Sequence, residues 1–343
     1  RRRPQLPEIS RKHRAGEIVL TPVGNRAGEV KAEHMQEATR IDWIGVDWGT
    51  TNLRAWAMRG SEVVATASAP VGMASLTRDA FEPALLNVID EWLAGSDTAP
   101  LPVIACGMVG ARQGWQEAPY VAVPSTPLVR DAMNPVACKD NRITVTIVHG
   151  LSQAHPADVM RGEETQIAGL LAMDPDFEGW SCLPGTHTKW AFIRDGRIER
   201  FRTFMTGELF DTLARNSVLR HAVDDAAAFD DEAFDAAICQ AAQDPAALAA
   251  NLFSIRAASL IEGSAPDVAR AHLSGLLIGM EIAALGDEIH QARPAIIGTD
   301  TLSGLYKRAI RLNGGQAQRL DGAGLARAGL HRAYELMLSE KKN

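Results

Sequence analysis

The sequence predicts an α/β protein of two lobes, in which one mixed β-sheet domain occurs twice. Three observations predict this fold class. The chain has 343 residues, which is enough for two domains with substantial cores. Segments with strand composition alternate with segments of helical periodicity, and the helical ones gather in the second half. A short strand–turn–strand pattern also occurs once in each half.

Each expected element has its own signal. Runs rich in β-branched and aromatic residues, bounded by glycine, proline or polar residues, predict strands. They are 41–47, 53–59, 62–68, 103–109, 143–149, 180–183, 189–194, 197–205 and 295–298. Apolar residues at helical spacing predict helices, and Asp244-Pro245 is typical of a helix start. The predicted helices are 81–93, 158–173, 207–215, 231–243, 244–253, 266–291, 303–313 and 322–338.

Composition and charge exclude several classes of protein. Lys plus Arg number 35 and Asp plus Glu number 42, so the formal net charge is −7 and general nucleic-acid binding is not expected. No apolar run reaches the roughly 18 residues of a membrane span. Cysteines 106, 138, 182 and 239 lie far apart, which excludes CxxC metal and redox motifs. Isolated thiols fit a reducing cytoplasm.

Residues 1–40 are basic and have little periodicity. One interpretation is a targeting arm. The other, which we favour, is a flexible leader upstream of the natural start, with Met35 as the initiator, because the globular pattern begins so abruptly at Ile41.

Two segments, 43–60 and 181–196, share one plan. In each, a strand leads through Gly-Thr into a second strand, and a glycine turn leads into a third. Gly49 and Gly60 are eleven residues apart, as are Gly185 and Gly196. A repeat of this kind predicts a duplicated domain.

Each repeated turn has the chemistry of a phosphate-binding loop. Glycine lets backbone N–H groups approach an anion, and neighbouring polar side chains add donors. The first loop is Gly49, Thr50, Thr51 and Asn52, and the second is Gly185, Thr186 and His187. Asp47, at a strand end, is a candidate ligand for hydrated Mg²⁺. Either turn alone is equally an ordinary hairpin, but two such turns facing each other would hold a nucleotide's phosphates from both sides.

This plan resembles the actin-like, sugar-kinase and heat-shock-chaperone ATPase fold, which is ribonuclease H-like. The resemblance implies a hinge between an N-terminal lobe at 41–160, which carries a substrate loop, and a C-terminal lobe at 161–343, which carries the adenosine site. Segment 295–306 then resembles the adenosine segment, with Gly298 and Thr299 at its turn. Taken alone, segment 295–306 is equally typical of an ordinary connection from a strand to a helix. A P-loop and a GxGxxG opening a helix are both absent.

Longer motifs resemble one family within that fold. They are DWGTTNLRAW at 47–56, GMVGARQGWQEAPY at 107–120, DVMRGEETQ at 158–166, CLPGTHTKW at 182–190 and FRTFMTGELF at 201–210. Together these strings resemble the 2-dehydro-3-deoxygalactonokinases. The resemblance implies ATP- and Mg²⁺-dependent phosphorylation of 2-dehydro-3-deoxy-D-galactonate at its 6-hydroxyl, in galactonate catabolism. The partner is then a small sugar acid, with neither nucleic acid nor membrane involved, and a homodimer is left open.

Four residues are candidates for substrate binding. An arginine binds a carboxylate well, and Arg112 lies in a loop rich in glycine and aromatic residues. Trp115 and Tyr120 would form a wall for the carbon chain, and Arg54 would reach the γ-phosphate or the substrate. The alternatives are a surface arginine and packing aromatics.

The catalytic carboxylate is predicted at the start of the helix 158–173. Asp158 is the first choice, with a helix N-cap as the alternative. Glu163 is the second choice, and Arg161 is expected to be structural or to pair with these acids. Lys189, which follows the second loop on a strand, is a further candidate for binding the nucleotide, and its side chain points either to the cleft or to solvent.

Two other functions are weighed against this kinase. One is a kinase for another sugar or sugar acid. The other is a non-kinase, nucleotide-switched filament or chaperone-like protein of the same fold.

Overall fold

The computed structural model describes residues 21–22, 40–94, 99–224, 228–286, 288–291 and 293–339. The prediction of a leader with Met35 as initiator therefore lies outside the described residues, except at positions 21, 22 and 40. Within the described ranges, no helix is both long and apolar enough to cross a membrane.

The first lobe is built on a mixed sheet. Its strand order, within the described chain, is β1-β4-β3-β2-β5-β8-β7. The strands are β1 (Thr21–Pro22), β2 (Trp43–Trp48), β3 (Leu53–Arg59), β4 (Glu62–Ala69), β5 (Leu101–Gly107), β7 (Asn134–Val136) and β8 (Ile143–Ile147). Strands β2, β3 and β4 are antiparallel neighbours, whereas β2, β5 and β8 run parallel.

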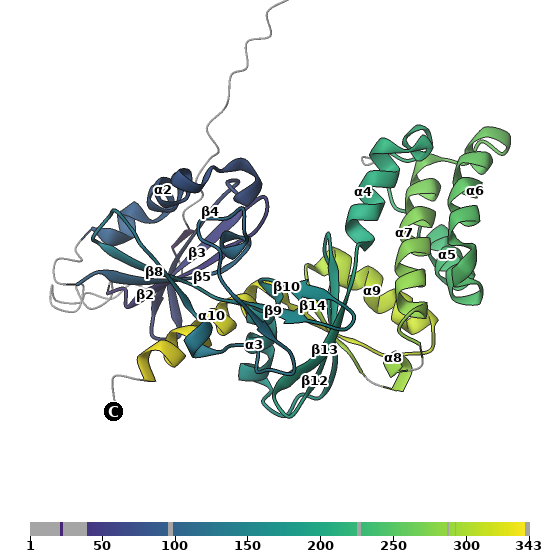
Figure 1. Ribbon diagram of the computed structural model, residues 1–343. Coiled ribbons are helices and arrows are strands. Elements are labelled where there is room, and N and C mark those ends of the chain that lie inside the picture. The colour runs from purple at the N-terminus through teal and green to yellow at the C-terminus, as the bar shows by residue number, and fades with distance from the viewer. Residues whose placement is uncertain are drawn as a thin grey trace, which may run out of the picture.

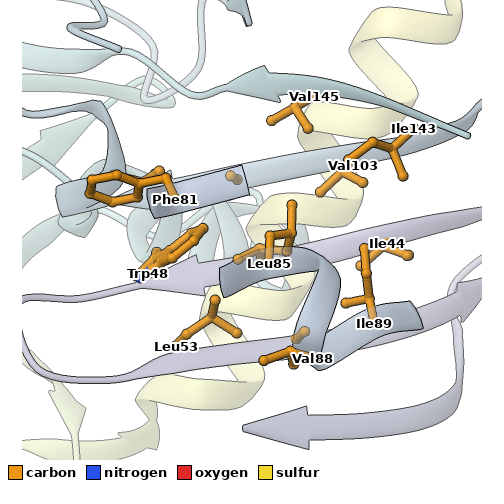
Figure 2. Close-up of a cluster of buried hydrophobic side chains, with 14 of the residues drawn as sticks. Ile44, Trp48, Leu53, Phe81, Leu85, Val88, Ile89, Val103, Ile143 and Val145 are labelled. Carbon is orange, nitrogen blue, oxygen red and sulfur yellow. The ribbon is translucent and has the colours of Figure 1, made fainter. Parts of the chain in front are cut away.

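Helix α2 (Phe81–Leu93) covers one face of this sheet. Phe81, Leu85 and Ile89 of α2 point at Trp48 and Ile44 of β2, and all five are fully buried (Figure 2). Each such side chain contributes about 1.5–3 kcal/mol when it leaves water. The C-terminal end of β2 leads into the first glycine loop. The packed core therefore gives this loop a rigid support.

The second lobe repeats the same sheet. Its strand order is β13-β12-β11-β14-β15. The strands are β11 (Gly179–Leu183), β12 (Thr188–Arg194), β13 (Arg197–Phe204), β14 (Ala295–Gly298) and β15 (Gln318–Asp321). As in the first lobe, a three-strand antiparallel meander is joined to parallel strands. Gly60 and Gly196 have positive φ angles of 56° and 67° at the two matching hairpin turns, so the predicted duplication is confirmed.

A group of helices lies beyond the second sheet, at the far side from the first lobe (Figure 1). They are α4 (Thr206–Asn216), α5 (Asp231–Gln243), α6 (Leu248–Ile261) and α7 (Pro266–Ala283), with α8 (Glu288–Gln291) and α9 (Asp300–Leu312) nearer the sheet. The predicted helix 266–291 was wrong at its end, because Gly286 has a φ of +64° and ends the helical path. The predicted end at 253 was also wrong, since α6 continues to Ile261.

Two helices cross between the lobes (Figure 1). They are α3 (Glu163–Met173) and α10 (Gly322–Leu338). The two helices approach closely because each has a glycine at the contact with the other, Gly169 in α3 and Gly329 in α10. A Cβ on Gly169 would lie 2.0 Å from the Leu325 carbonyl oxygen, and one on Gly329 would lie 1.8 Å from that of Thr165. Helix α10 also packs into a core with Trp43 of the first sheet, so the end of the chain returns to the first lobe.

A small third sheet precedes α3. Its strands are β6 (Tyr120–Ala122), β9 (Gly150–Gln153) and β10 (Asp158–Met160). The prediction that residues 158–162 begin a helix was wrong. Residues 158–160 pair with β9, and Gly162 has a φ of +104° directly before α3. Short 3-10 turns complete the described fold: η1 (Met73–Ser75), η2 (Arg78–Ala80), η3 (Met108–Gly110), η4 (Arg130–Ala132), η5 (Val218–His221) and η6 (Pro245–Ala247).

Candidate active site

A cleft of about 580 Å³ runs between the two sheets. Gly49 and Thr50 of the first glycine loop line it, and so do Gly185, Thr186 and His187 of the second. The two loops, about 136 residues apart in the sequence, therefore share one cavity, as their repetition predicts. Its other lining residues come from β2, β3, the ends of β5 and β11, the start of α3, the β14–α9 turn and the start of α10.

Backbone hydrogen bonds stabilise the first glycine loop. The Gly49 N–H donates to the Asn52 carbonyl at 2.9 Å, and the Met73 N–H donates to the Gly49 carbonyl at 3.1 Å. Thr51 and Asn52 are exposed and line a neighbouring cavity of about 500 Å³, which shares Gly49 with the cleft. The loop therefore presents a firm backbone with polar side chains at its rim.

Asp47 and Arg54 stand opposite each other on β2 and β3 and form an ion pair. Both line the cleft. The Asp47 side chain is 17% exposed, so its carboxylate is within reach of a ligand. Mg²⁺ in phosphate sites usually keeps several waters and takes one or two carboxylates, and Asp47 beside two phosphate-type loops fits that donor set. Burial, and then Asp47, raise the pKa of the neighbouring Cys106 thiol, which keeps it protonated.

The second loop lies open toward the cleft. No atom comes within 4 Å of a Cβ built on Gly185, so this position leaves free space. The Thr186 carbonyl accepts from the Glu208 N–H at 3.0 Å, and His187 pairs with the Glu208 side chain. The start of α4 thus supports this loop.

Of the two predicted carboxylates, the structure brings Glu163 to the cleft and not Asp158. Glu163 is the first residue of α3 and lines the cavity. Asp158 lies on β10, where its two carboxylate oxygens accept from the Thr203 N–H at 2.7 Å and the Thr203 hydroxyl at 2.6 Å. These bonds tie β10 to β13. Asp158 is neither a helix cap nor part of the cleft lining.

Lys189 of β12 is buried beside the start of α3. Its ammonium is 3.6 Å from the Glu163 carboxylate, and its side chain is only 6% exposed. The same ammonium donates to the His187 carbonyl at 3.4 Å. It therefore links the second loop to the start of α3, and of the two orientations left open for Lys189 the solvent-facing one is wrong.

Glu164 is fully buried behind this point. One oxygen accepts from the Gly162 N–H at 2.7 Å and the other from the Thr165 hydroxyl at 2.9 Å. Burial, and then the charge of Glu163, raise its pKa to about 7. These hydrogen bonds of Glu164 thus stabilise the turn that positions Glu163.

Three of the predicted substrate residues lie outside the cleft lining. Arg112 is exposed, and its carbonyl accepts from Arg78 at 2.9 Å. Trp115 is buried in the core of the first lobe, where it stacks on Phe81. These surroundings are those of a packing residue, which was the alternative to substrate binding. Tyr120 is exposed and lies under the guanidinium of Arg161. Arg161 itself lines the cleft.

An apolar cavity of about 540 Å³ adjoins the cleft. It shares Gly185, Thr186, Thr299 and Leu302 with the cleft and is walled by Phe210, Phe229, Leu277, Ile278, Leu305 and Tyr306. Gly298 and Thr299 lie at the β14–α9 turn between the two cavities, where the adenosine segment was predicted. Leu305 and Tyr306 belong to the predicted adenosine segment 295–306, and Phe210 ends the string at 201–210. The sequence does not indicate Phe229, Leu277 and Ile278 as wall residues, because they come from a loop and from α7.

A buried polar network lies behind the second loop. Glu281 of α7 accepts from the Trp190 indole at 2.5 Å and the Tyr306 hydroxyl at 2.9 Å, and also from the Thr206 hydroxyl. The Tyr306 hydroxyl is 2.9 Å from that of Thr188, in the strand that leaves the loop. Burial raises the pKa of Glu281 to about 7. The sequence does not indicate this network, because Glu281 is a single acidic residue within an apolar helical segment.

Comparisons with known proteins agree with this geometry. A family model described as DGOK, 2-keto-3-deoxy-galactonokinase, matches residues 47–333. The candidate 2-dehydro-3-deoxygalactonokinase DgoK1 of Rhizobium meliloti (strain 1021) is 41% identical over 299 residues, which cover 85% of this chain and 96% of the relative. The 2-dehydro-3-deoxygalactonokinase of Escherichia coli (strain K12) is 32% identical over 292 residues, which cover 84% and 96%.

A solved structure is similar along almost its whole length. It is the crystal structure of a candidate 2-dehydro-3-deoxygalactonokinase from Sinorhizobium meliloti, with a TM-score of 0.78 and 38% identity, and the match covers 86% of this chain and 99% of that one. The duplicated sheets, the shared cleft and these matches establish the predicted two-lobed, actin-like kinase fold. The chain belongs to the 2-keto-3-deoxy-galactonokinase family.

Proposed function

We propose that this protein transfers the γ-phosphoryl group of ATP to the 6-hydroxyl of 2-dehydro-3-deoxy-D-galactonate. The products are ADP and 2-dehydro-3-deoxy-6-phosphogalactonate, an intermediate of galactonate catabolism. The observation that carries the proposal is the cleft in which both glycine loops and Glu163 meet. The names of the relatives support the choice of substrate.

The nucleotide spans the two adjoining cavities. Its adenine occupies the apolar cavity beside Tyr306 and Phe210, and Gly298 and Thr299 border the adenosine. Its phosphates lie between the two loops, whose backbone N–H groups donate to the phosphate oxygens. Such preorganised donors stabilise the charge that spreads over the transferred group.

Asp47 would hold a hydrated Mg²⁺ at the phosphates, and the ion would neutralise part of their charge there. Arg54, paired with Asp47, stands at the same wall and reaches the γ-phosphate side of the cleft. Thr51 and Asn52 donate from the rim of the first loop.

Glu163 is the proposed base. Its carboxylate orients the 6-hydroxyl and receives the hydroxyl proton as the oxygen bonds to the γ-phosphorus and the bond to ADP breaks. Lys189 and the Arg161 N–H, which donates to Glu163 at 2.9 Å, hold the carboxylate in place. This assigns to Glu163 the role first predicted for Asp158.

A coupled ADP-release assay tests the function. The keto-deoxy acid, glycerol, gluconate and glucose are offered with Mg·ATP. We expect turnover of the keto-deoxy acid well above the other three. Turnover of another sugar in its place would move the protein to a different substrate. ATP-dependent polymerisation in a sedimentation assay, without turnover of any sugar, would favour a nucleotide-switched protein.

Location and assembly complete the proposal. A cytoplasmic site of action is supported by the free thiols of the described chain, at Cys106, Cys138, Cys182 and Cys239. A homodimer stays a prediction, which sedimentation velocity measures directly.

A further inference from the structure

Glu281 of α7 lies where the walls of the proposed nucleotide site meet. It is fully buried, and it belongs to the lining of neither cavity. Its carboxylate accepts hydrogen bonds from three other elements, through Trp190 of β12, Thr206 of α4 and Tyr306 of α9. Helices α4, α7 and α9 line the apolar cavity, and β12 leaves the second glycine loop. A change at Glu281 can therefore reach a nucleotide only through these neighbours.

One route leads from Glu281 to the second glycine loop through two hydroxyl groups. The Tyr306 hydroxyl is 2.9 Å from the carboxylate and 2.9 Å from the Thr188 hydroxyl. The Gly185 N–H donates to the Thr188 hydroxyl oxygen at 3.5 Å. Thr188 and Tyr306 are buried, and a hydroxyl can both donate and accept, so the hydrogen bonds form a continuous chain. This chain fixes the position of Thr188, the residue at which the loop ends.

A second route reaches the same loop through the start of α4. The carboxylate also accepts from the hydroxyl of Thr206, the first residue of this helix. The next residue, Gly207, packs against the loop, since a Cβ there would lie 2.5 Å from the Gly185 carbonyl oxygen. The Glu208 N–H then donates to the Thr186 carbonyl at 3.0 Å. A displacement of Thr206 would therefore displace the loop, because close-packed groups leave no room for independent movement.

The two glycine loops are stabilised differently. In the first, the Gly49 N–H donates to Asn52, and the N–H groups at 73–74 donate to carbonyls of the loop. Within the described ranges, the second loop makes one backbone hydrogen bond of this kind, the one from Glu208. N–H groups that stabilise phosphate charge must be held in place before that charge develops. Side chains behind the second loop therefore supply the positioning that backbone contacts supply in the first.

We propose that Glu281 is a positioning residue for the second phosphate loop. By holding Tyr306 and Thr206, it keeps the N–H groups of the loop in place for the phosphates of the nucleotide. A buried polar network whose members are all hydrogen-bonded makes the surrounding structure rigid. This inference rests on the proposed function, in which the loop binds phosphate. Removal of the carboxylate should weaken binding of the phosphates far more than binding of the adenosine group.

Nucleotide binding in the absence of sugar tests this role. Isothermal titration calorimetry gives the Kd of adenosine and the Kd of a non-hydrolysable ATP analogue with Mg²⁺. We define the phosphate ratio as the first Kd divided by the second. For the unmodified protein we expect a ratio on the order of a hundred or more, because several charge-assisted hydrogen bonds hold the phosphates. Glu281→Leu removes the acceptor of all three hydrogen bonds and should lower the ratio by about ten- to thirtyfold.

Two further variants separate positioning from a general loss of stability. In Glu281→Gln the amide oxygen can accept from Trp190 and the amide nitrogen can donate to the Tyr306 hydroxyl, so the phosphate ratio should stay within about threefold. Glu82→Leu is the matched control. Glu82 is also buried, but its carboxylate accepts from two backbone N–H groups of the first lobe, at 2.6 and 2.7 Å. This variant should lower the urea unfolding midpoint and leave the phosphate ratio within about threefold.

The outcomes are distinct. If Glu281→Leu keeps the phosphate ratio within threefold, or if Glu82→Leu lowers it as much, Glu281 only stabilises the core and the proposal is wrong. If Glu281→Leu no longer binds adenosine, Tyr306→Phe decides, because it keeps the ring and breaks the chain of hydroxyl groups. A three- to tenfold lower ratio is then expected, and an unchanged one overturns the proposal. A ratio below about threefold in the unmodified protein refutes the proposed nucleotide site, whereas a large ratio that does not respond to Glu281 refutes only this inference.

Discussion

At the scale of single residues, environment separates carboxylates that look alike in the sequence. The carboxylate oxygens of Asp158 accept hydrogen bonds from Thr203, whereas Glu163 lines the cleft. Glu164 and Glu281 are buried, and their pKa values are raised. A carboxylate whose oxygens are already bonded within the fold stabilises that fold, and one that faces a phosphate cleft is free to act on a substrate.

A pair of isosteric substitutions tests that division. Glu163→Gln should lower kcat by about 10²- to 10⁴-fold, the usual contribution of a positioned base, with ATP affinity within threefold. Asp158→Asn should leave kcat within a few-fold and lower the unfolding free energy by about 1–2 kcal/mol, because one acceptor to Thr203 is lost. Steady-state kinetics and urea unfolding measure the two effects. The reverse pattern would return the base to Asp158.

Glu281 gives a pH-dependent stability. The pKa of Glu281 in the fold is about 7, above the ordinary value of 4.5. The contribution of protonated Glu281 to the free energy of unfolding is therefore complete below about pH 4.5 and is lost as pH rises through about 7. Above that pH the loss is of the order of 3 kcal/mol. Glu281→Gln cannot ionise and can still accept from Trp190.

We therefore expect the stability of Glu281→Gln, relative to the unmodified protein, to improve as pH rises from 5 to 8. Urea unfolding at each pH measures the difference. Glu164, whose pKa is also raised, is present in both proteins and cancels. A stability difference that does not change with pH would contradict the assignment of this proton to Glu281.

At the scale of elements, the crossing of α3 and α10 decides how the lobes join. Gly169 and Gly329 bring the two helix backbones close, and Leu330 of α10 packs with Trp43 of the first sheet. Because α3 begins with Glu163, this crossing also sets the position of the proposed base. Small residues at the contact allow that approach, since interiors are close-packed.

One methyl group tests this contact. Gly329→Ala would place its Cβ 1.8 Å from the Thr165 carbonyl, which forces the helices apart and should cost about 3 kcal/mol of unfolding free energy. Gly304→Ala, in α9, is the matched control. Its Cβ meets only Arg319 at 3.4 Å, so helix propensity should stabilise it by about 0.5–1 kcal/mol. Equal unfolding midpoints for the two variants would show that the helices adjust freely.

At the scale of the whole molecule, the cleft has walls from both lobes, and each wall carries one phosphate-type loop. A triphosphate that bonds to both loops draws the walls together, because each new contact favours the closed arrangement. Closure would also exclude water and so limit ATP hydrolysis in the absence of sugar.

Small-angle scattering tests this closure. A non-hydrolysable ATP analogue together with the keto-deoxy acid should reduce the radius of gyration below that of the free protein, and nucleotide alone should give a smaller decrease. ATPase activity without sugar should be far below the kinase rate. An unchanged radius with both ligands bound would mean that the walls are rigid.

Local sequence determined the elements and the loops of this protein. Helices at 81–93, 231–243 and 322–338 and the strand at 53–59 were predicted at their observed bounds. Periodicity and flanking residues carry this information within one segment. The repeated Gly-Thr turns predicted a shared phosphate cleft, because the same local chemistry occurred twice.

Tertiary structure alone decided which side chains enter that cleft. Asp158 and Glu163 are five residues apart, yet a strand and the positive φ of Gly162 send them to different surroundings. Arg161 lines the cleft with its guanidinium enclosed by Gly110, Ala118 and Tyr120, whereas Arg112 lies exposed outside the cleft lining. Burial and pairing depend on contacts between distant segments, and no local pattern contains them.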